Sequence, residues 1–257
     1  MNIKSQNIIP TFKIVCKEIK KMYSNDSQSF IGIILGFILV FTIRLLLLSL
    51  DSLFIDDGYT IQYLIFMIST WLLITGIEVG YSKLIFNKID LIPTNIKNIF
   101  NHFSLLPTYI GGIIINVCIL ILSIIPGILY IYMKYGFQIF DIVTDSFSDP
   151  YYKELINSYF NTNDLLIISI LLIVPILLIQ LRCCFWNLYV IDKNCSPINA
   201  FKKSWSITQN QELKIFVYFI LFIILNGLGV LGGIIGLCFT LPISYLFIFI
   251  YYRLLNE

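Results

Sequence analysis

A run of 38 residues without a charge, 215-IFVYFILFIILNGLGVLGGIIGLCFTLPISYLFIFIYY-252, decides the fold of this chain. As one helix it would be about 57 Å long, roughly twice the hydrocarbon thickness of a bilayer. The run must therefore fold back on itself. Asn226-Gly227-Leu228-Gly229 and Gly232-Gly233 contain the weak helix formers that a reversal needs. The sequence thus predicts a transmembrane hairpin in this part of the chain.

Hydrophobic residues make up 58% of the 257 residues, and charged residues make up 12%. Typical soluble domains contain about 45 to 50% apolar and about 25% charged residues, so the excess apolar surface needs lipid to cover it. The longest polar stretches have about 30 residues, which is too few for a separate soluble domain. We therefore expect an all-α protein that forms a single integral membrane domain over residues 1–257.

Apolar stretches long enough to cross a bilayer occur six times along the chain. They cover residues 29–50, 59–82, 107–133, 165–185, 214–230 and 235–252. The first is not a cleavable signal peptide, because it contains Arg44 and no small-residue cleavage site follows it. The expected architecture is a polytopic bundle of six transmembrane helices.

Basic residues are distributed very unevenly among the segments that join these spans. Of the 17 lysines and arginines, 14 lie before the first span, after the second, between the end of the fourth and the start of the fifth, or after the sixth. The intervening segments hold two lysines and eight of the 15 acids. Segments rich in lysine and arginine stay on the cytoplasmic side of a membrane. We therefore expect a multi-pass protein of the cell membrane with both termini in the cytoplasm.

Short amphipathic segments precede the first, third and fifth spans, at residues 11–24, 94–106 and 197–208. In each, apolar residues recur at helical spacing with polar or basic residues between them. This pattern is typical of a helix that lies in the cytoplasmic membrane interface with its lysines toward anionic headgroups. The order suggests three repeats of one interfacial helix followed by a two-span hairpin. These helices either only anchor the bundle, or they recognise specific lipids or partners.

The third amphipathic segment has the clearest boundary signals. Ser196 is suited to cap a helix, and Pro197 is suited to its first position. Tryptophan is common at the boundary between lipid and water, and lysine is attracted to anionic headgroups. The sequence predicts Ile198, Phe201 and Trp205 on one face of this helix, opposite Lys202 and Lys203.

Three charged residues lie inside the predicted spans, where ionisable groups are costly and often functional. Arg44 lies near the outer end of the first span, Glu78 near the inner end of the second, and Arg182 near the inner end of the fourth. Arg44 and Glu78 differ in expected depth by about 15 Å, which makes them poor partners. We expect a structural ion pair between Glu78 and Arg182, and the alternative is a gating or proton-coupled role.

Prolines and glycines occur inside several spans. Pro126, Pro175 and Pro242 interrupt the third, fourth and sixth spans and are expected to kink them. Broken helices of this kind form the binding sites of transporters, and they also occur in inert bundles. Pairs of the form Gly-x-x-x-Gly allow helices to approach closely. They start at Gly32, Gly76, Gly229 and Gly232.

Motifs of common enzyme classes are missing from the sequence. It contains no Walker loop, no His-Glu-x-x-His, no Gly-x-Ser-x-Gly and no pair of carboxylates on one face of a span. His102 is the only histidine, which argues against a Cys/His zinc site. The acids Asp141, Asp145 and Asp149 lack the spacing of a cation site. We therefore expect a protein that is not an enzyme, needs no cofactor or metal, and has no nucleic-acid partner.

Five short motifs rich in glycine, proline and aromatic residues follow one another along the chain. They are Gly76-Ile-Glu-Val-Gly80, Ile99-Phe100-Asn-His-Phe103, Ile125-Pro126-Gly127-Ile128 with Tyr135, the run from Pro197 to Trp205, and the run from Gly227 to Tyr252 with Pro242. Their order resembles the bacterial family of the domain of unknown function 975, and the related membrane domain of some glycerophosphodiester phosphodiesterases. The resemblance implies a six-span bundle of unsettled function. It supplies no catalytic residue, because the catalytic domain of those phosphodiesterases has no counterpart in this sequence.

Three function classes remain open. The leading one is a non-enzymatic accessory protein that binds membrane lipids or other membrane proteins through its cytoplasmic interfacial helices. It includes an immunity-type role against a membrane-active peptide. The second is a small transporter or channel with a site between kinked spans. The third is a membrane-embedded protein of lipid metabolism, for which the sequence offers no nucleophile and base.

Overall fold

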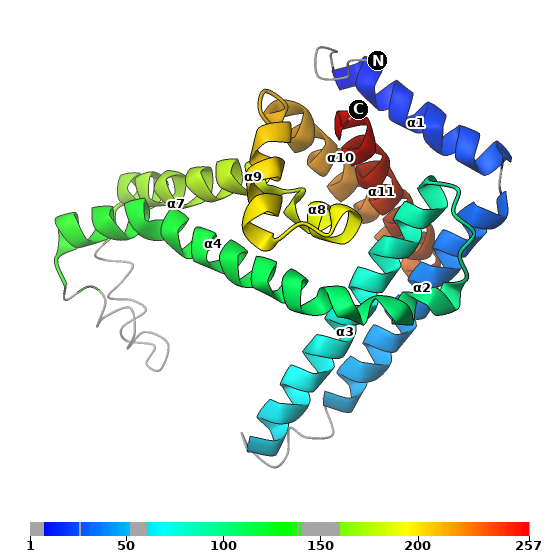
Figure 1. Cartoon of the computed structure of the whole chain (residues 1–257). Coiled ribbons are helices and arrows are strands. Elements are labelled where there is room, and N and C mark those ends of the chain that lie inside the picture. The colour runs from blue at the N-terminus through cyan, green and yellow to red at the C-terminus, as the bar shows by residue number, and fades with distance from the viewer. Residues whose placement is uncertain (1–7, 26, 52–60, 138, 140–159, 257) are drawn as a thin grey trace. The chain divides into compact units, whose positions relative to one another are not determined.

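The computed structural model describes residues 8–25, 27–51, 61–137, 139 and 160–256 (Figure 1). Every regular element in this part of the chain is a helix, so the all-α prediction is confirmed. The elements are α1 (Ile8–Asn25), α2 (Ser27–Asp51), α3 (Ile61–Ile89), the 3-10 helix η3 (Ile96–Leu105), α4 (Leu106–Tyr135), α7 (Thr162–Cys183), α8 (Trp186–Lys193), α9 (Pro197–Ile207), α10 (Glu212–Leu231) and α11 (Gly233–Asn256).

Six helices of the described chain, namely α2, α3, α4, α7, α10 and α11, are long and apolar enough to cross a bilayer. Each coincides with one of the six predicted spans, so the multi-pass membrane prediction is confirmed. Many apolar side chains on these helices are exposed, for example Leu64 at 60% and Ile223 at 72%, as expected of a surface that acyl chains cover. The helices α1, η3 and α9 coincide with the three predicted amphipathic segments.

Contacts between residues divide the chain into two compact units. Unit 1 comprises residues 1–112 and 184–257, and unit 2 comprises residues 113–183. Helix α4 begins in unit 1 and continues through unit 2. The single membrane domain expected for residues 1–257 stays a prediction.

The predicted hairpin forms in unit 1 and reverses at Gly232 and Gly233, between α10 and α11. Gly233 has φ +68°, a backbone conformation that residues with a side chain rarely adopt. Residues 226–229, also expected in the reversal, instead remain helical within α10. Gly229 serves close packing there, because a Cβ on Gly236 would lie only 2.2 Å from the Gly229 carbonyl oxygen.

Helix η3 packs against a glycine-lined surface of α3 in unit 1. A Cβ on Gly80 would lie 1.8 Å from the carbonyl oxygen of Ile99, and a Cβ on Gly76 would lie 2.3 Å from the Phe103 ring. Ile99 is fully buried by this contact. The Gly76-x-x-x-Gly80 motif therefore receives η3, and part of the apolar face predicted to lie in the membrane interface is covered by protein instead.

The core of unit 1 is rich in aromatic residues from α3, α10 and α11. The centroid of the Phe86 ring lies 4.7 Å from that of Phe249 and 5.7 Å from that of Tyr252. Tyr252 is fully buried. Helix α1 joins this assembly, because Tyr218 OH of α10 donates a hydrogen bond to the Ile8 carbonyl oxygen over 3.0 Å. The first amphipathic segment is thus attached to the bundle by a direct contact.

The described part of unit 2 consists mainly of residues from α4 and α7. Leu172 of α7 fills the space beside Gly127 of α4, where a Cβ would lie 2.3 Å from the leucine side chain. The buried carboxylate of Asp164 accepts hydrogen bonds from Lys134 and from Tyr135, the latter at 2.5 Å. These contacts hold the end of α4 and the start of α7 together.

Prolines lie inside three of the spanning helices without ending them. Pro126 lies inside α4, Pro175 inside α7 and Pro242 inside α11, and each helix continues past its proline. The kinks expected at these positions stay a prediction. Asp141, Asp145 and Asp149 lie outside the described residues.

Candidate functional site

The fourth span ends slightly earlier than the sequence predicts, and a separate short helix follows it. Helix α7 ends at Cys183, and α8 begins at Trp186. The Trp186 ring lies over Gly112, where a Cβ would be 2.0 Å away, and stacks on Phe201 with 5.2 Å between ring centroids. Helix α8 is followed by Asn194, whose left-handed conformation (φ 50°) suits asparagine and ends the helix.

Helix α9 presents one face to the protein and another outward. Its buried residues are Ala200, Phe201, Ser204 and Ile207. Pro197 lies in the first turn as predicted, but Ser196 makes no side-chain capping hydrogen bond. Ile198 and Trp205 are 61% and 49% exposed. Phe201 lies three residues after Ile198 and four before Trp205, so it belongs to the edge of their face as predicted, but stacking on Trp186 leaves it only 8% exposed.

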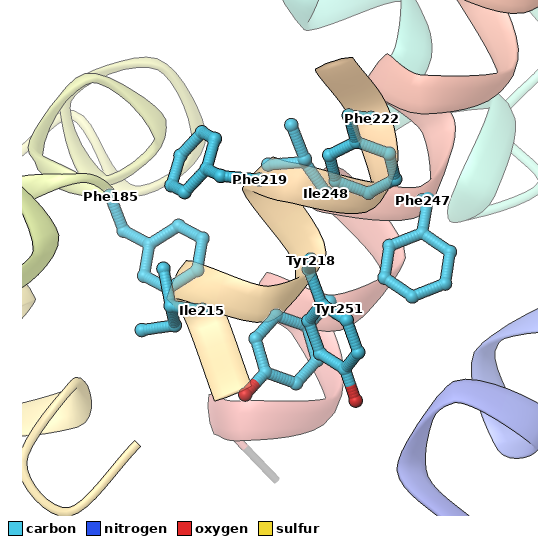
Figure 2. Close-up of a pocket in the computed structure, with 8 residues that line it drawn as sticks. All are labelled: Phe185, Ile215, Tyr218, Phe219, Phe222, Phe247, Ile248 and Tyr251. Carbon is cyan, nitrogen blue, oxygen red and sulfur yellow. The ribbon is translucent and has the colours of Figure 1, made fainter. Parts of the chain in front are cut away.

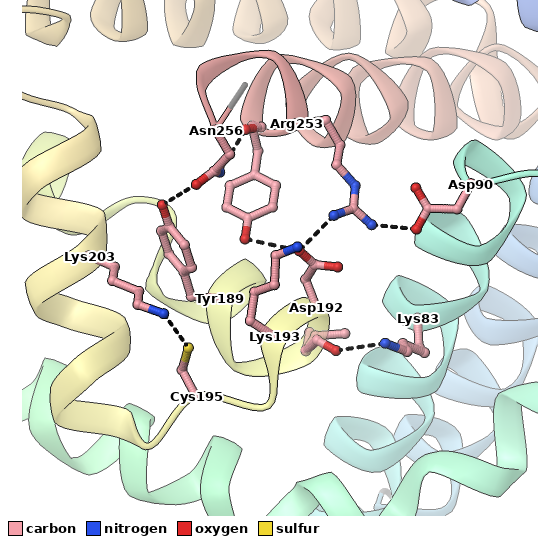
Figure 3. A network of polar contacts seen from close by, with 11 residues as sticks. Lys83, Asp90, Tyr189, Asp192, Lys193, Cys195, Lys203, Arg253 and Asn256 are labelled. Carbon is pink, nitrogen blue, oxygen red and sulfur yellow. Dashed lines mark hydrogen bonds and ion pairs between the residues drawn. The ribbon is translucent and has the colours of Figure 1, made fainter.

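A polar network joins the end of α3 to the last turns of α8 and α11 (Figure 3). The Asp192 carboxylate, 6% exposed, accepts hydrogen bonds from Arg253 Nη1 at 2.8 Å and from Tyr252 OH at 3.2 Å. Arg253 Nη2 also donates to Asp90 at 2.5 Å, and its guanidinium lies 4.8 Å from the centre of the Phe86 ring. One arginine thus pairs with one carboxylate from α8 and another from the turn that follows α3.

A second set of contacts places α8 and α9 beside this network (Figure 3). Tyr189 OH donates a hydrogen bond to Asn256 Oδ1 over 2.7 Å. Lys203 Nζ lies 3.3 Å from Cys195 Sγ and 5.8 Å from the centre of the Tyr189 ring. Lys193 Nζ lies 3.4 Å from the carboxylate of the preceding residue. These contacts give the two lysine side chains defined positions.

An open hollow of about 400 Å³ lies beside these contacts. It is lined by Tyr189, Lys193, Lys203, Ser206, Ile207, Leu255 and Asn256. Two ammonium groups and no carboxylate are among these lining residues. In the adjoining network the charges of Lys83, Lys193, Lys203 and Arg253 outnumber those of Asp90 and Asp192. The arrangement is suited to an anion, because the ammonium groups donate charge-assisted hydrogen bonds.

Arg44 and Glu78, the charges of the first two spans, form an ion pair with 3.0 Å between Nη1 and Oε1. The prediction that they are poor partners is therefore wrong, and the partner of Glu78 is Arg44 where Arg182 was expected. Side chains on a helix lean toward its N-terminus, so on the antiparallel helices α2 and α3 these two long side chains extend toward each other. Arg182 lies in the last turn of α7, in unit 2.

A much smaller cavity of about 20 Å³ lies between α10 and α11 (Figure 2). It is lined by Phe185, Ile215, Tyr218, Phe219, Phe222, Phe247, Ile248 and Tyr251. A space of this size holds about one water molecule, and its walls are almost entirely apolar. We interpret it as a gap between packed aromatic rings rather than a ligand site.

Sequence patterns could not reveal the hollow, because its lining comes from α8, α9 and α11 and no motif predicts how these helices pack. The single signal was the excess of lysine around residues 193–203. Among the described residues, no group of three or more His, Cys, Asp and Glu side chains is placed to hold a metal ion. Comparisons with protein-family models, with curated proteins and with solved structures find no match for the chain.

Proposed function

We propose that this protein is a non-enzymatic multi-pass protein of the bacterial cell membrane that binds anionic lipids on the cytoplasmic side through α9. The observation that carries the proposal is the 49% exposure of Trp205 on a helix whose opposite face is buried in protein. A tryptophan held outward beside membrane-spanning helices is suited to the boundary between acyl chains and headgroups. Lys202, which is also exposed, adds electrostatic attraction to anionic headgroups.

Contacts within unit 1 support a common side for several lysine-rich segments. Tyr218 links α10 to the first residue of α1, and Arg253 links the end of α11 to Asp90 after α3. Tyr189 and Asn256 link α8 to the same end of α11. The positive-inside rule favours the cytoplasm for such an end. The cytoplasmic termini and the relationship to the family of the domain of unknown function 975 belong to the same proposal.

The transporter alternative gains no support from the intramembrane charges. Glu78, the acid whose isolation would favour ion coupling, is paired with Arg44. Binding of other membrane proteins, including an immunity-type partner, would use the same outward face of α9 and stays a prediction.

Full-length protein in vesicles with brominated acyl chains tests the proposal. Bromine quenches the fluorescence of nearby indoles. The emission of Trp205 is obtained by subtracting the spectrum of the Trp205→Phe variant. Bromines near the headgroup end of the acyl chains should quench this emission.

Lys202→Gln should weaken binding of anionic lipid about fivefold, which corresponds to about 1 kcal/mol for one charge near the surface. Lys202→Arg, which keeps the charge, is the matched control. Unquenched Trp205 emission, or equal binding of anionic and neutral lipids, would contradict the proposal.

A further inference from the structure

The hollow beside α8, α9 and α11 is lined by two lysines and by no carboxylate. Lys193 comes from the end of α8 and Lys203 from the middle of α9, so cations from two elements line one space. The nearest carboxylate, Asp192, is already bonded to Arg253 and Tyr252. Lys193 Nζ also lies 3.4 Å from this carboxylate, so Asp192 is shared between Arg253 and Lys193. Lys203 forms no ion pair with a carboxylate of the described residues, so its positive charge remains available in the hollow.

Lys203 is held in place rather than freely solvated. Its ammonium group lies 3.3 Å from Cys195 Sγ and 5.8 Å from the Tyr189 ring centre, and the Tyr189 hydroxyl is fixed by Asn256. Ser206 follows three residues later, so it shares the face of α9 that carries Lys203. A preorganised ammonium group with a hydroxyl beside it costs less ordering entropy on binding an anion.

Apolar side chains complete the hollow and distinguish it from a site for a free ion. Ile207 and Leu255 are 5% and 3% exposed and contribute to its lining. Trp205, the boundary tryptophan, directly precedes Ser206, so the two residues lie at the same level along α9. A ligand with an anionic group and an adjoining apolar part matches these two kinds of lining.

We propose that the hollow binds one anionic phospholipid, with its phosphate between Lys193 and Lys203 and its glycerol end against Ile207 and Leu255. The Ser206 hydroxyl donates a further hydrogen bond to the phosphate. This inference rests on the proposed function, because it requires α9 to lie at the membrane surface.

Native mass spectrometry of the full-length protein in neutral detergent tests the inference, with phosphatidic acid, phosphatidylglycerol and phosphatidylcholine as probes. Lys193→Gln and Lys203→Gln should each weaken binding of the first phosphatidic acid molecule about fivefold, and should change phosphatidylcholine binding little. Lys97→Gln, which removes an equal charge from η3, outside both α9 and the hollow, is the matched control and should leave this first binding step within about twofold. Equal melting temperatures of the variants would show that each is folded.

Competition with inorganic phosphate separates the two sources of the phosphate group. Millimolar phosphate should not displace the lipid, because it lacks the part that contacts the apolar lining; full displacement would overturn the lipid assignment. Equal losses from Lys193→Gln, Lys203→Gln and Lys97→Gln would overturn the hollow, whereas quenching of Trp205 in vesicles would still support lipid binding by α9. If wild-type protein retains no anionic lipid and Trp205 is not quenched in vesicles, the proposed function itself fails.

Discussion

Arg44 and Glu78 have side chains that are 55% and 44% exposed, although both lie in helices that cross the membrane. In water, a pair with this exposure would contribute about 0 to 1 kcal/mol to stability. Lipid cannot solvate a charged group as water does. Removal of either partner therefore leaves the other charge uncompensated. We therefore expect that breaking the pair lowers stability by more than the net attraction between the two charges contributes.

We predict that Arg44→Gln and Glu78→Gln each lower the melting temperature in detergent, and that the double variant Arg44→Gln with Glu78→Gln loses less than the sum. The coupling should be about 1 kcal/mol, within the range measured for contacting residues. Glu78→Gln combined with Arg182→Gln is the control, since these two substitutions should add. Strict additivity for Arg44 and Glu78, or coupling with Arg182 instead, would contradict the observed pair.

At the scale of elements, the docking of η3 on α3 depends on a contact that only glycine permits. The Ile99 carbonyl oxygen would lie 1.8 Å from a Cβ at Gly80, and it belongs to the backbone, which cannot rotate away as a side chain can. An added methyl group must displace η3 or bend α3.

We predict that Gly80→Ala destabilises the protein by about 3 kcal/mol, the upper part of the usual range for overpacking. Gly227→Ala is the matched control, because Gly227 lies inside α10 and a Cβ there meets nothing within 4 Å. Alanine should leave that site unchanged or stabilise it slightly, since alanine is the better helix former. Thermal unfolding of both variants in the same detergent provides the measurement. Similar melting temperatures for the two would show that η3 does not dock as described.

At the scale of the whole molecule, the orientation in the membrane is a property of charge distribution that labelling can measure. We predict that, in a cysteine-free background, Ser148→Cys reacts with an impermeant maleimide in intact cells and Gln209→Cys reacts only after permeabilisation. Gln209 is exposed just beyond α9, whereas Ser204 is fully buried and unsuitable for labelling. Labelling of Gln209→Cys in intact cells would reverse the assigned orientation.

The sequence by itself determined the helical class, the six spans and the three amphipathic segments, because these depend on local quantities. Span length follows from a rise of 1.5 Å per residue against a fixed bilayer thickness, and amphipathicity follows from the helical repeat. The reversal at Gly232 and Gly233 was likewise predictable from weak helix formers in an overlong apolar run.

Only the tertiary structure decided how these elements use their side chains. The expected depths of Arg44 and Glu78 in the membrane differ too much for a pair, if only the backbone positions are compared. The direction and length of the two side chains nevertheless bring their charged groups together. Phe201 is buried because it stacks on Trp186, which belongs to the preceding helix α8 and not to the repeat of α9. The hollow between Lys193 and Lys203 arises where α8, α9 and α11 converge, and such contacts between segments far apart in sequence leave no periodic signal in any one of them.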